Sequence, residues 1–182
     1  MSSIPFPNKK YNIIYADPAW SYRDKASSGK RGACFKYPTV TQDWLNELPV
    51  QEISNNDCIL FIWVTHPKLN EVFDLIKNWG FEYKTCAFTW VKRNKKANTW
   101  FMGMGTWTRA NSELCLLATK GKPKRLSASV RSIIDTPIEQ HSKKPDCVRD
   151  KIVELCGDLP RIELFARQKV EGWDCWGNEV GG

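Results

Sequence analysis

Short, nearly continuous apolar runs recur along the chain and constrain its fold more than any other feature. They are YNIIYA (11–16), CILFIWV (58–64), CAFTWV (86–91), LCLLAT (114–119) and IELFA (162–166). Each has the length of a strand, and none alternates strictly between apolar and polar residues. Strands of this kind are buried on both faces, as the strands of a parallel sheet are. The chain is therefore expected to form a mostly parallel sheet that is covered on both sides.

Helical patterns lie between the apolar runs. After Pro67, apolar residues repeat with helical spacing as far as Trp79. A second helix is predicted to begin at Pro145 and to end at Gly157, and a shorter one follows Thr41. Strands that alternate with helices define an α/β fold with helices on both faces of the sheet. Because no linker or repeat interrupts the pattern, all 182 residues are expected to form a single domain.

Two stretches fit neither the sheet nor the helices. Residues 23–37 are basic and rich in Gly and Ser, and residues 98–113 combine glycines with Trp100 and Trp107. Both stretches are predicted to be loops at strand ends, which is where α/β proteins bind their ligands.

The charge balance favours a polyanionic partner. The chain has 27 Lys and Arg against 20 Asp and Glu, which gives a formal net charge of +7. Its nine Trp also supply flat rings on which bases can stack. The basic stretches Lys92–Lys96 and Lys120–Arg125 are expected to be solvated faces, unless they lie on the catalytic side and follow a phosphate backbone. We therefore expect nucleic acid as the partner.

The cysteines and histidines do not form a recognisable metal site. No two of the seven Cys have Cys-x-x-Cys spacing, and the chain has only two His, so no zinc site of standard spacing can be written. The thiols are expected to be free, in a reducing compartment. No apolar leader begins the chain, and no apolar run is long enough to span a membrane. We expect a soluble, cytoplasmic protein with no metal and no membrane contact.

Several common catalytic motifs are missing from the sequence. There is no Gly-x-x-x-x-Gly-Lys-Ser/Thr phosphate loop and no Gly-x-Ser-x-Gly nucleophile elbow. Gly103-Met104-Gly105 lacks the third glycine and the preceding strand of a dinucleotide-binding fingerprint. These absences disfavour nucleotide hydrolysis, serine hydrolase chemistry and dehydrogenase chemistry.

The most informative motif is Asp17-Pro18-Ala19-Trp20, directly after the first apolar run. The plain interpretation is a strand that ends in a turn, because Asp-Pro is common turn chemistry. The motif also suits the exocyclic amine of a base. A carboxylate and a backbone carbonyl that accept its two N–H bonds would direct the nitrogen lone pair out of the ring plane, toward an electrophilic methyl group. Proline fixes φ, so its carbonyl points in a defined direction, and the ring of Trp20 or Tyr22 could stack on the base.

The motif resembles the Asp-Pro-Pro-Trp signature of the MT-A family of adenine-N(6) methyltransferases. The resemblance continues in chain order over almost the whole sequence. The matching segments are KYPTVT (36–41), LFIWVTHP (60–67), WGFEYKT (79–85), TWVKRNK (89–95), GMGTWTRANSELCLLATKGKP (103–123), HSKKPD (141–146) and RIELFAR…GWDCWGNE (161–179). It implies a Rossmann-like class I methyltransferase fold with a circularly permuted motif order, and S-adenosylmethionine as cofactor. Ala19 stands where a second proline is usual, which is expected to loosen the turn without loss of activity.

The resemblance also implies roles for individual residues. Asp17 and Pro18 would hold the target amine, and Trp20 and Tyr22 would help to build the base pocket. The residues expected to face the nucleic acid are Tyr37, Trp107 and Arg109, together with the basic loop 23–37. The residues expected to bind the cofactor are Ala16, Lys144, Glu163, Phe165, Arg167, Asn178 and Glu179. An acid suits ribose hydroxyls, and a cation suits the methionine carboxylate or a phosphate.

Some of these residues have simpler interpretations that the sequence leaves open. Trp20 could pack against the end of the sheet, and Lys144 could be solvated. Arg109 and Arg167 could form structural ion pairs. A lone acid in a buried strand needs a partner, so a ligand role is favoured for Glu163.

The sequence thus predicts S-adenosylmethionine-dependent methyl transfer to the N(6) amine of adenine in nucleic acid. DNA is favoured, by analogy with the compact bacterial and phage members of the family, and RNA is the alternative. A non-catalytic nucleic-acid-binding or scaffold subunit is a second alternative, against which the presence of Asp17 argues. A cytosine amine is a third, although its usual signature has Ser or Asn in place of Asp17 and Tyr in place of Trp20. Homo- or hetero-oligomerisation is left open.

Overall fold

The strands form a seven-stranded sheet in the computed structural model, which describes residues 4–20 and 41–180. Their order is β5-β3-β4-β2-β1-β6-β7. The strands are β1 (Tyr11–Ala16), β2 (Ser54–Val64), β3 (Glu82–Arg93), β4 (Ser112–Lys120), β5 (Ile133–Pro137), β6 (Arg161–Leu164) and β7 (Asp174–Trp176). Within this sheet six strands run in one direction, and β4 runs opposite to its neighbours β2 and β3. The predicted α/β fold with a mostly parallel sheet is confirmed.

Three α-helices and two short 3₁₀ turns connect the strands that the structure describes. They are α1 (Gln42–Glu47), η2 (Val50–Ile53), η3 (His66–Lys68), α2 (Leu69–Asn78) and α3 (Cys147–Cys156). The short helix α1 begins where the Thr41 side chain accepts a hydrogen bond from the backbone N–H of Trp44, at 3.2 Å. The helix after Pro145 ends at Gly157, whose φ of 98° suits glycine.

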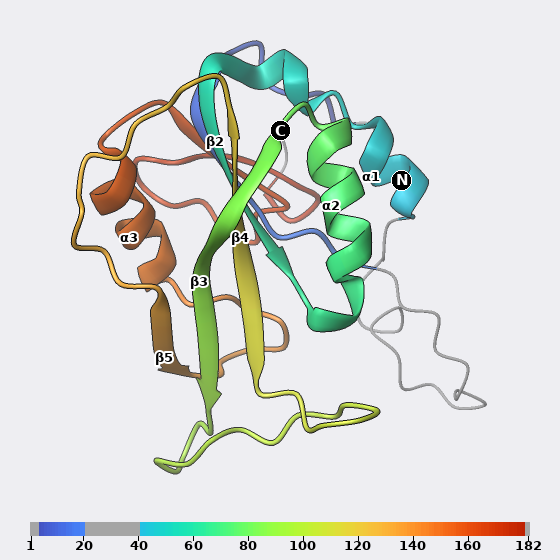
Figure 1. Ribbon diagram of the computed structural model, residues 1–182, viewed down its shortest axis with the longest axis vertical. Helices are drawn as coiled ribbons and strands as arrows, with labels where there is room; N and C mark the ends of the chain where they lie inside the picture. The colour runs from blue at the N-terminus through green and yellow to red at the C-terminus, as the bar shows by residue number, and fades with distance from the viewer. Residues whose placement is uncertain (1–3, 21–40, 181–182) are drawn as a thin grey trace.

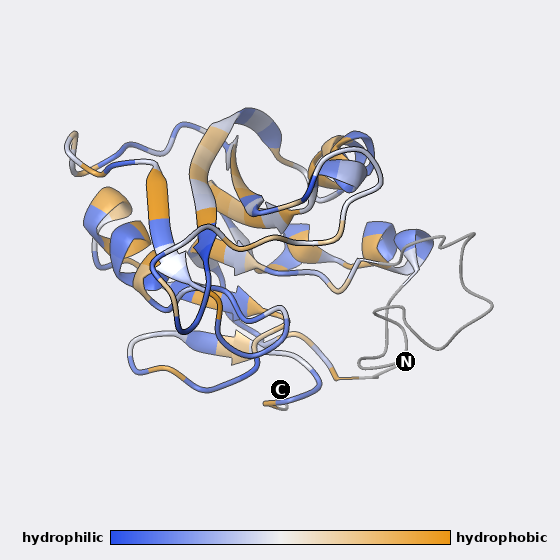
Figure 2. Ribbon diagram, turned by 90° about the horizontal axis from the view of Figure 1, so that it is seen from below, coloured by the Kyte–Doolittle hydropathy of each residue, from blue (hydrophilic) through white to orange (hydrophobic). Residues whose placement is uncertain are grey.

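Alternate residues of β1 face two separate apolar clusters. Ile14 and Ala16 pack with residues of α1 and α2 on one face, whereas Ile13 and Tyr15 pack with residues of α3 on the other. In Figure 2 the apolar segments, coloured orange, concentrate on the strands and on parts of the flanking helices. Strands β1 and β6 and the 58–64 part of β2 are therefore buried on both faces, as their apolar runs predicted, whereas much of β3 and β5 is exposed or only partly buried.

The direction of β4 differs from the prediction. The run 114–119 reads as a parallel strand because it is buried and does not alternate, yet β4 pairs antiparallel with both neighbours. The reason lies in the connection: residues 94–111 leave β3 and return to the same end of the sheet, so that β4 runs back beside β3 as its antiparallel neighbour. The edge strands β5 and β7 were not predicted, because they are short and largely outside the apolar runs.

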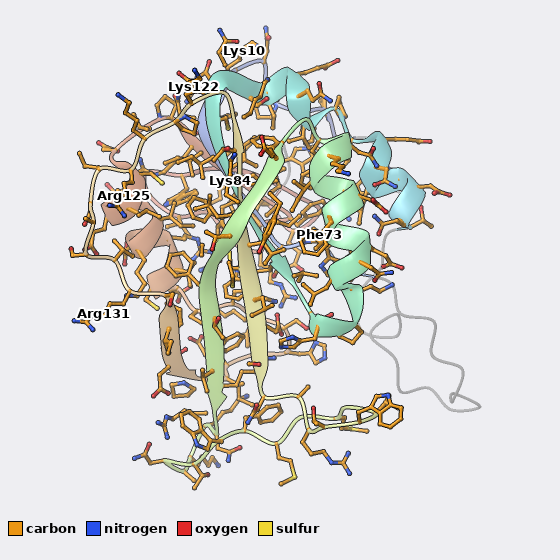
Figure 3. All side chains as sticks on the ribbon, in the orientation of Figure 1. Lys10, Phe73, Lys84, Lys122, Arg125 and Arg131 are labelled. Atoms are coloured by element: carbon orange, nitrogen blue, oxygen red, sulfur yellow. The ribbon has the colours of Figure 1, made fainter. Side chains whose placement is uncertain are left out.

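This topology brings the ends of most strands to one edge of the sheet, called here the catalytic edge. The carboxyl ends of six strands and the amino end of β4 lie there, so Asp17 and Glu113 share it. The loop between β3 and β4 also extends from this edge, below the sheet in Figure 1. In contrast, Lys122 follows the carboxyl end of β4 and lies at the opposite edge, near Lys10 (Figure 3). The stretch Lys120–Arg125 is thus away from the catalytic edge, and Lys92–Lys96 is at it.

Two further features concern the whole of the described chain. Across residues 4–20 and 41–180, no helix has the length and apolar character that are needed to cross a membrane. The six cysteines in these ranges are free thiols, and Cys58, Cys115 and Cys156 among them are buried.

Candidate active site

Asp17 follows β1 directly, at the centre of the catalytic edge. Ala16 pairs with Ile62 of β2 and with Leu164 of β6 and is fully buried, so it fixes the backbone just before the acid. The Asp17 side chain is 22% exposed. Crevices outside the carboxyl ends of such strands are the usual ligand sites of open α/β sheets. The Asp17 carboxylate is therefore held rigidly where a ligand can reach it.

A chain of alternating charges joins Asp17 to the two stems of the β3–β4 loop. The Lys144 ammonium lies 3.2 Å from Oδ2 of Asp17 and 3.2 Å from Oε2 of Glu113. The other Glu113 oxygen, Oε1, accepts a hydrogen bond of 2.7 Å from the Lys92 ammonium. Both Lys144 and Glu113 are almost completely buried. We call Asp17, Lys144, Glu113 and Lys92 the charge chain.

Burial and the neighbouring charges shift the pKa values of Asp17, Glu113 and Lys144. Burial raises the pKa of the Asp17 carboxyl above its usual value, and the Lys144 ammonium only partly opposes this shift. Burial acts in the same direction on Glu113, but the ammonium groups of Lys144 and Lys92 outweigh it and lower the Glu113 pKa. For Lys144, burial is outweighed by the two carboxylates, which raise its pKa. The surroundings thus favour the charged forms of Glu113 and Lys144, whereas burial disfavours the charged form of Asp17.

A second buried ion pair lies beside the first. Both carboxylate oxygens of Glu163, on β6, accept hydrogen bonds from the Arg149 guanidinium of α3, at 2.7 and 3.0 Å. Arg149 also donates to Asp146, at 3.0 Å. Burial raises the Glu163 pKa, and the bonds from Arg149 oppose that shift. Glu163 therefore has a structural partner, and it also lines the pocket described next.

An open pocket of about 150 Å³ joins the two ion pairs. Its walls are formed by Tyr15, Asp17, Gln140, Lys143, Lys144, Arg149, Glu163, Phe165, Arg167, Gln168 and Glu179. Two non-glycine residues of the described chain have a left-handed backbone, Ser142 (φ 57°) and Phe165 (φ 60°). Both lie in segments that line this pocket, and such strained residues cluster at functional sites.

The structure gathers most of the residues predicted to bind a cofactor. Lys144, Glu163, Phe165, Arg167 and Glu179 line the pocket together with Asp17. Ala16 is in the core beneath it, and Asn178 is an exposed neighbour of Glu179 that is not part of the lining.

Trp20 lies in the core rather than in the pocket. Its side chain is 6% exposed, and its indole N–H donates to the carbonyl of Trp63, at 3.0 Å. Of the two interpretations left open by the sequence, the structure shows packing, and a stacking role for this ring is not what the geometry provides. The Trp20 backbone N–H also donates to the Pro18 carbonyl, at 3.0 Å, which leaves that oxygen one lone pair for a ligand.

The residues predicted to face nucleic acid are divided between the loop and the segment outside the described ranges. Trp107 and Arg109 lie in the β3–β4 loop, at the catalytic edge, and both are exposed. Tyr22, Tyr37 and the basic loop 23–37 lie outside the described residues.

Sequence reasoning did not identify Glu113, Lys92 and Arg149 as parts of the site. Glu113 is an acid at the start of an apolar run, and Arg149 stands between apolar residues of α3, so each carried a signal: a charge in a buried element needs a partner. The sequence did not show which charged residues are in contact. Glu113 lies beside Lys144 because β4 runs antiparallel, which brings its amino end to this edge of the sheet.

The comparisons with known proteins agree with this fold. Residues 11–179 match the MT-A70 family model. The chain is a class I methyltransferase and belongs to the MT-A70 family. It is similar to the Type II methyltransferase M.MunI of Mycoplasma sp, with 38% identity over 96% of this chain and 79% of that protein.

More distant relatives are considerably longer proteins. The human N(6)-adenosine-methyltransferase catalytic subunit METTL3 is 28% identical over 95% of this chain, but the match covers 29% of that protein. The MT-A70-like N(6)-adenosine-methyltransferase of Drosophila melanogaster is also 28% identical, over 27% of its length. The family predicted from the motifs is confirmed, as is the enzyme class.

Proposed function

We propose that this protein transfers a methyl group from S-adenosylmethionine to the N(6) amine of adenine in DNA. The observation that carries the proposal is the Asp17 carboxylate, fixed at the end of β1 at the mouth of a pocket lined by acids and cations. Membership of the MT-A70 family supports it.

Asp17 and Pro18 would act on the acceptor. The ionised carboxylate accepts one N–H of the adenine amine, and the free lone pair of the Pro18 carbonyl accepts the other. Held in this way, the amine presents its nitrogen lone pair out of the ring plane. As the new N–C bond forms, the S–CH3 bond would break and leave a neutral thioether, so that the positive charge moves to the nitrogen. The Asp17 carboxylate would stabilise that charge and could take the proton that the nitrogen releases.

The pocket beside Asp17 has the chemistry that S-adenosylmethionine requires. The lone pairs of Glu163 and Glu179 suit ribose hydroxyls or the ammonium group, and Lys143 and Arg167 suit the carboxylate. When bound, the cofactor supplies a methyl group on a positively charged sulfur, which makes the carbon electrophilic. Lys144 contacts both Asp17 and Glu113 and also lines the pocket. We therefore assign it two roles, positioning these two carboxylates and contributing to the cofactor pocket.

DNA is favoured over RNA because of how the relatives compare in length. The Type II methyltransferase, a kind of DNA-modifying enzyme, matches this chain over most of both lengths. The N(6)-adenosine-methyltransferases match it over less than a third of theirs. A scaffold subunit is disfavoured by the intact acceptor acid. The cytoplasm, where the free thiols would stay reduced, is the location we propose.

Two experiments test this proposal: calorimetry with the cofactor, and a competition between DNA and RNA as substrates. Titration with S-adenosylmethionine is expected to give one binding site per chain, whereas a scaffold subunit would give no heat. With labelled cofactor and equal amounts of DNA and RNA, the label is expected mainly in DNA. Incorporation mainly into RNA would reverse the choice of substrate, and binding without incorporation into either would refute the enzyme activity.

Lys144→Met is expected to move the acidic limb of the pH profile of kcat/KM to higher pH. The Asp17 carboxylate must be ionised to accept an N–H bond, so activity is lost as the pH falls through its pKa. Lys144 opposes the effect of burial on that pKa, and its removal therefore raises the pKa further. Lys124→Met, at an exposed position of the opposite edge, is the control and should leave the limb in place. If the acidic limb of Lys144→Met keeps its wild-type position or shifts to lower pH, the role given to Lys144 beside Asp17 is contradicted.

A further inference from the structure

Residues 101–111 of the β3–β4 loop form a narrow projection, called here the finger. Both of its ends are held by the backbone of Lys92, whose carbonyl accepts from Phe101 N–H and whose N–H donates to the Asn111 carbonyl, each at 2.9 Å. Its two arms touch at the glycines. A Cβ on Gly103 would lie 1.9 Å from the Ala110 carbonyl oxygen, and one on Gly105 would lie 1.9 Å from that of Thr108. The finger is thin because these positions lack a side chain.

The finger presents large apolar side chains to solvent. Trp107 is 97% exposed, Met104 93% and Met102 74%. A chain that buries most of its tryptophans rarely leaves one fully exposed on a projecting turn without a binding role.

The loop that contains the finger carries a positive charge of its own. Residues 94–112 contain three cations, Lys95, Lys96 and Arg109, and no acid. At its base the Arg93 guanidinium lies 3.9 Å from the centre of the Trp100 ring. Apolar side chains flanked by cations suit a polyanion that also has apolar surfaces. Nucleic acid has both, because its phosphates are anionic and its stacked bases have apolar faces.

The base of the finger is connected to Asp17 by the charge chain. Its stems begin at Lys92 and Glu113, which form one end of the charge chain, and Glu113 reaches Asp17 through the single ammonium of Lys144. In Figure 1 the β3–β4 loop projects from the sheet on this same edge. The finger therefore projects from the same end of the sheet at which Asp17 lies.

We propose that the finger is a wedge that inserts Met104 and Trp107 into a DNA duplex beside the target adenine. The inference rests on the proposed function. The N(6) amine of a paired adenine is engaged in its base pair, so the base must leave the helix before Asp17 can hold that amine. Inserted apolar side chains unstack a base step and occupy the space that an extruded base leaves. A rigid projection with apolar residues at its tip suits this task on a duplex, and a single strand would not need it.

The test compares one DNA in two forms. Labelled methyl transfer is measured on unmethylated genomic DNA, native and heat-denatured, with wild type, Trp107→Ala, Trp107→Phe and the control Leu126→Ala. Leu126 is also exposed, at 76%, but lies in the segment after β4. Trp107→Ala is expected to lose roughly tenfold or more on the duplex and less than about twofold on the denatured strands. Trp107→Phe should recover most of the duplex rate, and Leu126→Ala should match wild type.

Each other outcome counts against the wedge. An equal loss on both DNA forms would identify a general binding surface, and no loss on the duplex would leave the finger without this role. A change of oligomeric mass in Trp107→Ala, measured by light scattering, would identify the finger as a protein contact. If wild type methylates neither form, the proposed function fails, and the wedge is then judged by unwinding of relaxed plasmid in the presence of a topoisomerase. Unwinding by wild type and not by Trp107→Ala supports the wedge, and no difference overturns it.

Discussion

Asp17→Asn is expected to lower turnover at least about a hundredfold without changing the fold. The amide has nearly the same shape as the carboxylate but lacks the negative charge that stabilises the methylated, positively charged nitrogen. It also leaves the Lys144 ammonium, now paired with Glu113 alone, directed at the acceptor. The effect should fall on kcat more than on cofactor binding, because Asp17 serves the acceptor.

Initial rates with saturating cofactor measure this change, and calorimetry with S-adenosylmethionine reports the pocket separately. Asp74→Asn is the matched control, since Asp74 is an exposed residue of α2 on which no part of the site depends. A rate within about threefold of wild type for Asp17→Asn would rule out the role given to the carboxylate.

Arg149→Met is expected to destabilise the protein by about 3–5 kcal/mol, because it leaves the buried Glu163 carboxylate without its partner. The free energy of unfolding from urea titration measures this loss. The double variant Arg149→Met with Glu163→Gln should recover part of it, since no uncompensated charge then remains. Cofactor affinity should be lower in the double variant than in wild type, because the pocket has lost the Glu163 carboxylate.

The control for Arg149→Met is a surface ion pair. Lys84, labelled in Figure 3, pairs with Glu82 at 3.0 Å, and both side chains are well exposed. Lys84→Met should therefore change stability by less than about 1 kcal/mol. If Arg149→Met were no more destabilising than Lys84→Met, the Glu163–Arg149 pair would not be the buried anchor described above.

Much of the fold was predictable because its strands are unusually apolar. Runs such as 58–64 and 162–166 are buried on both faces, and this property is visible without any knowledge of pairing. The direction of β4 was not visible in its own residues, because burial on both faces fits either direction. The missing helix between residues 94 and 111 did not settle the direction either, because β6 and β7 are parallel although no helix joins them. That residues 1–182 form one domain stays a prediction.

Site residues at the end of an apolar strand, or within one, could be predicted from the sequence. Site residues that depend on contacts between distant elements could not. Asp17 and Glu163 stand out as acids at or in apolar runs. Glu113 and Arg149 complete the site through contacts that are set by strand order and by the placement of α3 on the sheet. Trp20 is the opposite case. Its place in the motif suggested a role in base binding, but in the structure its side chain is buried in the core and donates a hydrogen bond to the Trp63 carbonyl. The effect of Ala19 on the turn remains untested.

The most direct test of the account is to identify the methylated nucleoside. The protein is incubated with isotope-labelled S-adenosylmethionine and unmethylated DNA, the DNA is digested to nucleosides, and mass spectrometry locates the label. The account predicts labelled 6-methyladenine with wild type and very little with Asp17→Asn. Label in a methylated cytosine, or 6-methyladenine formed equally by both proteins, would contradict it.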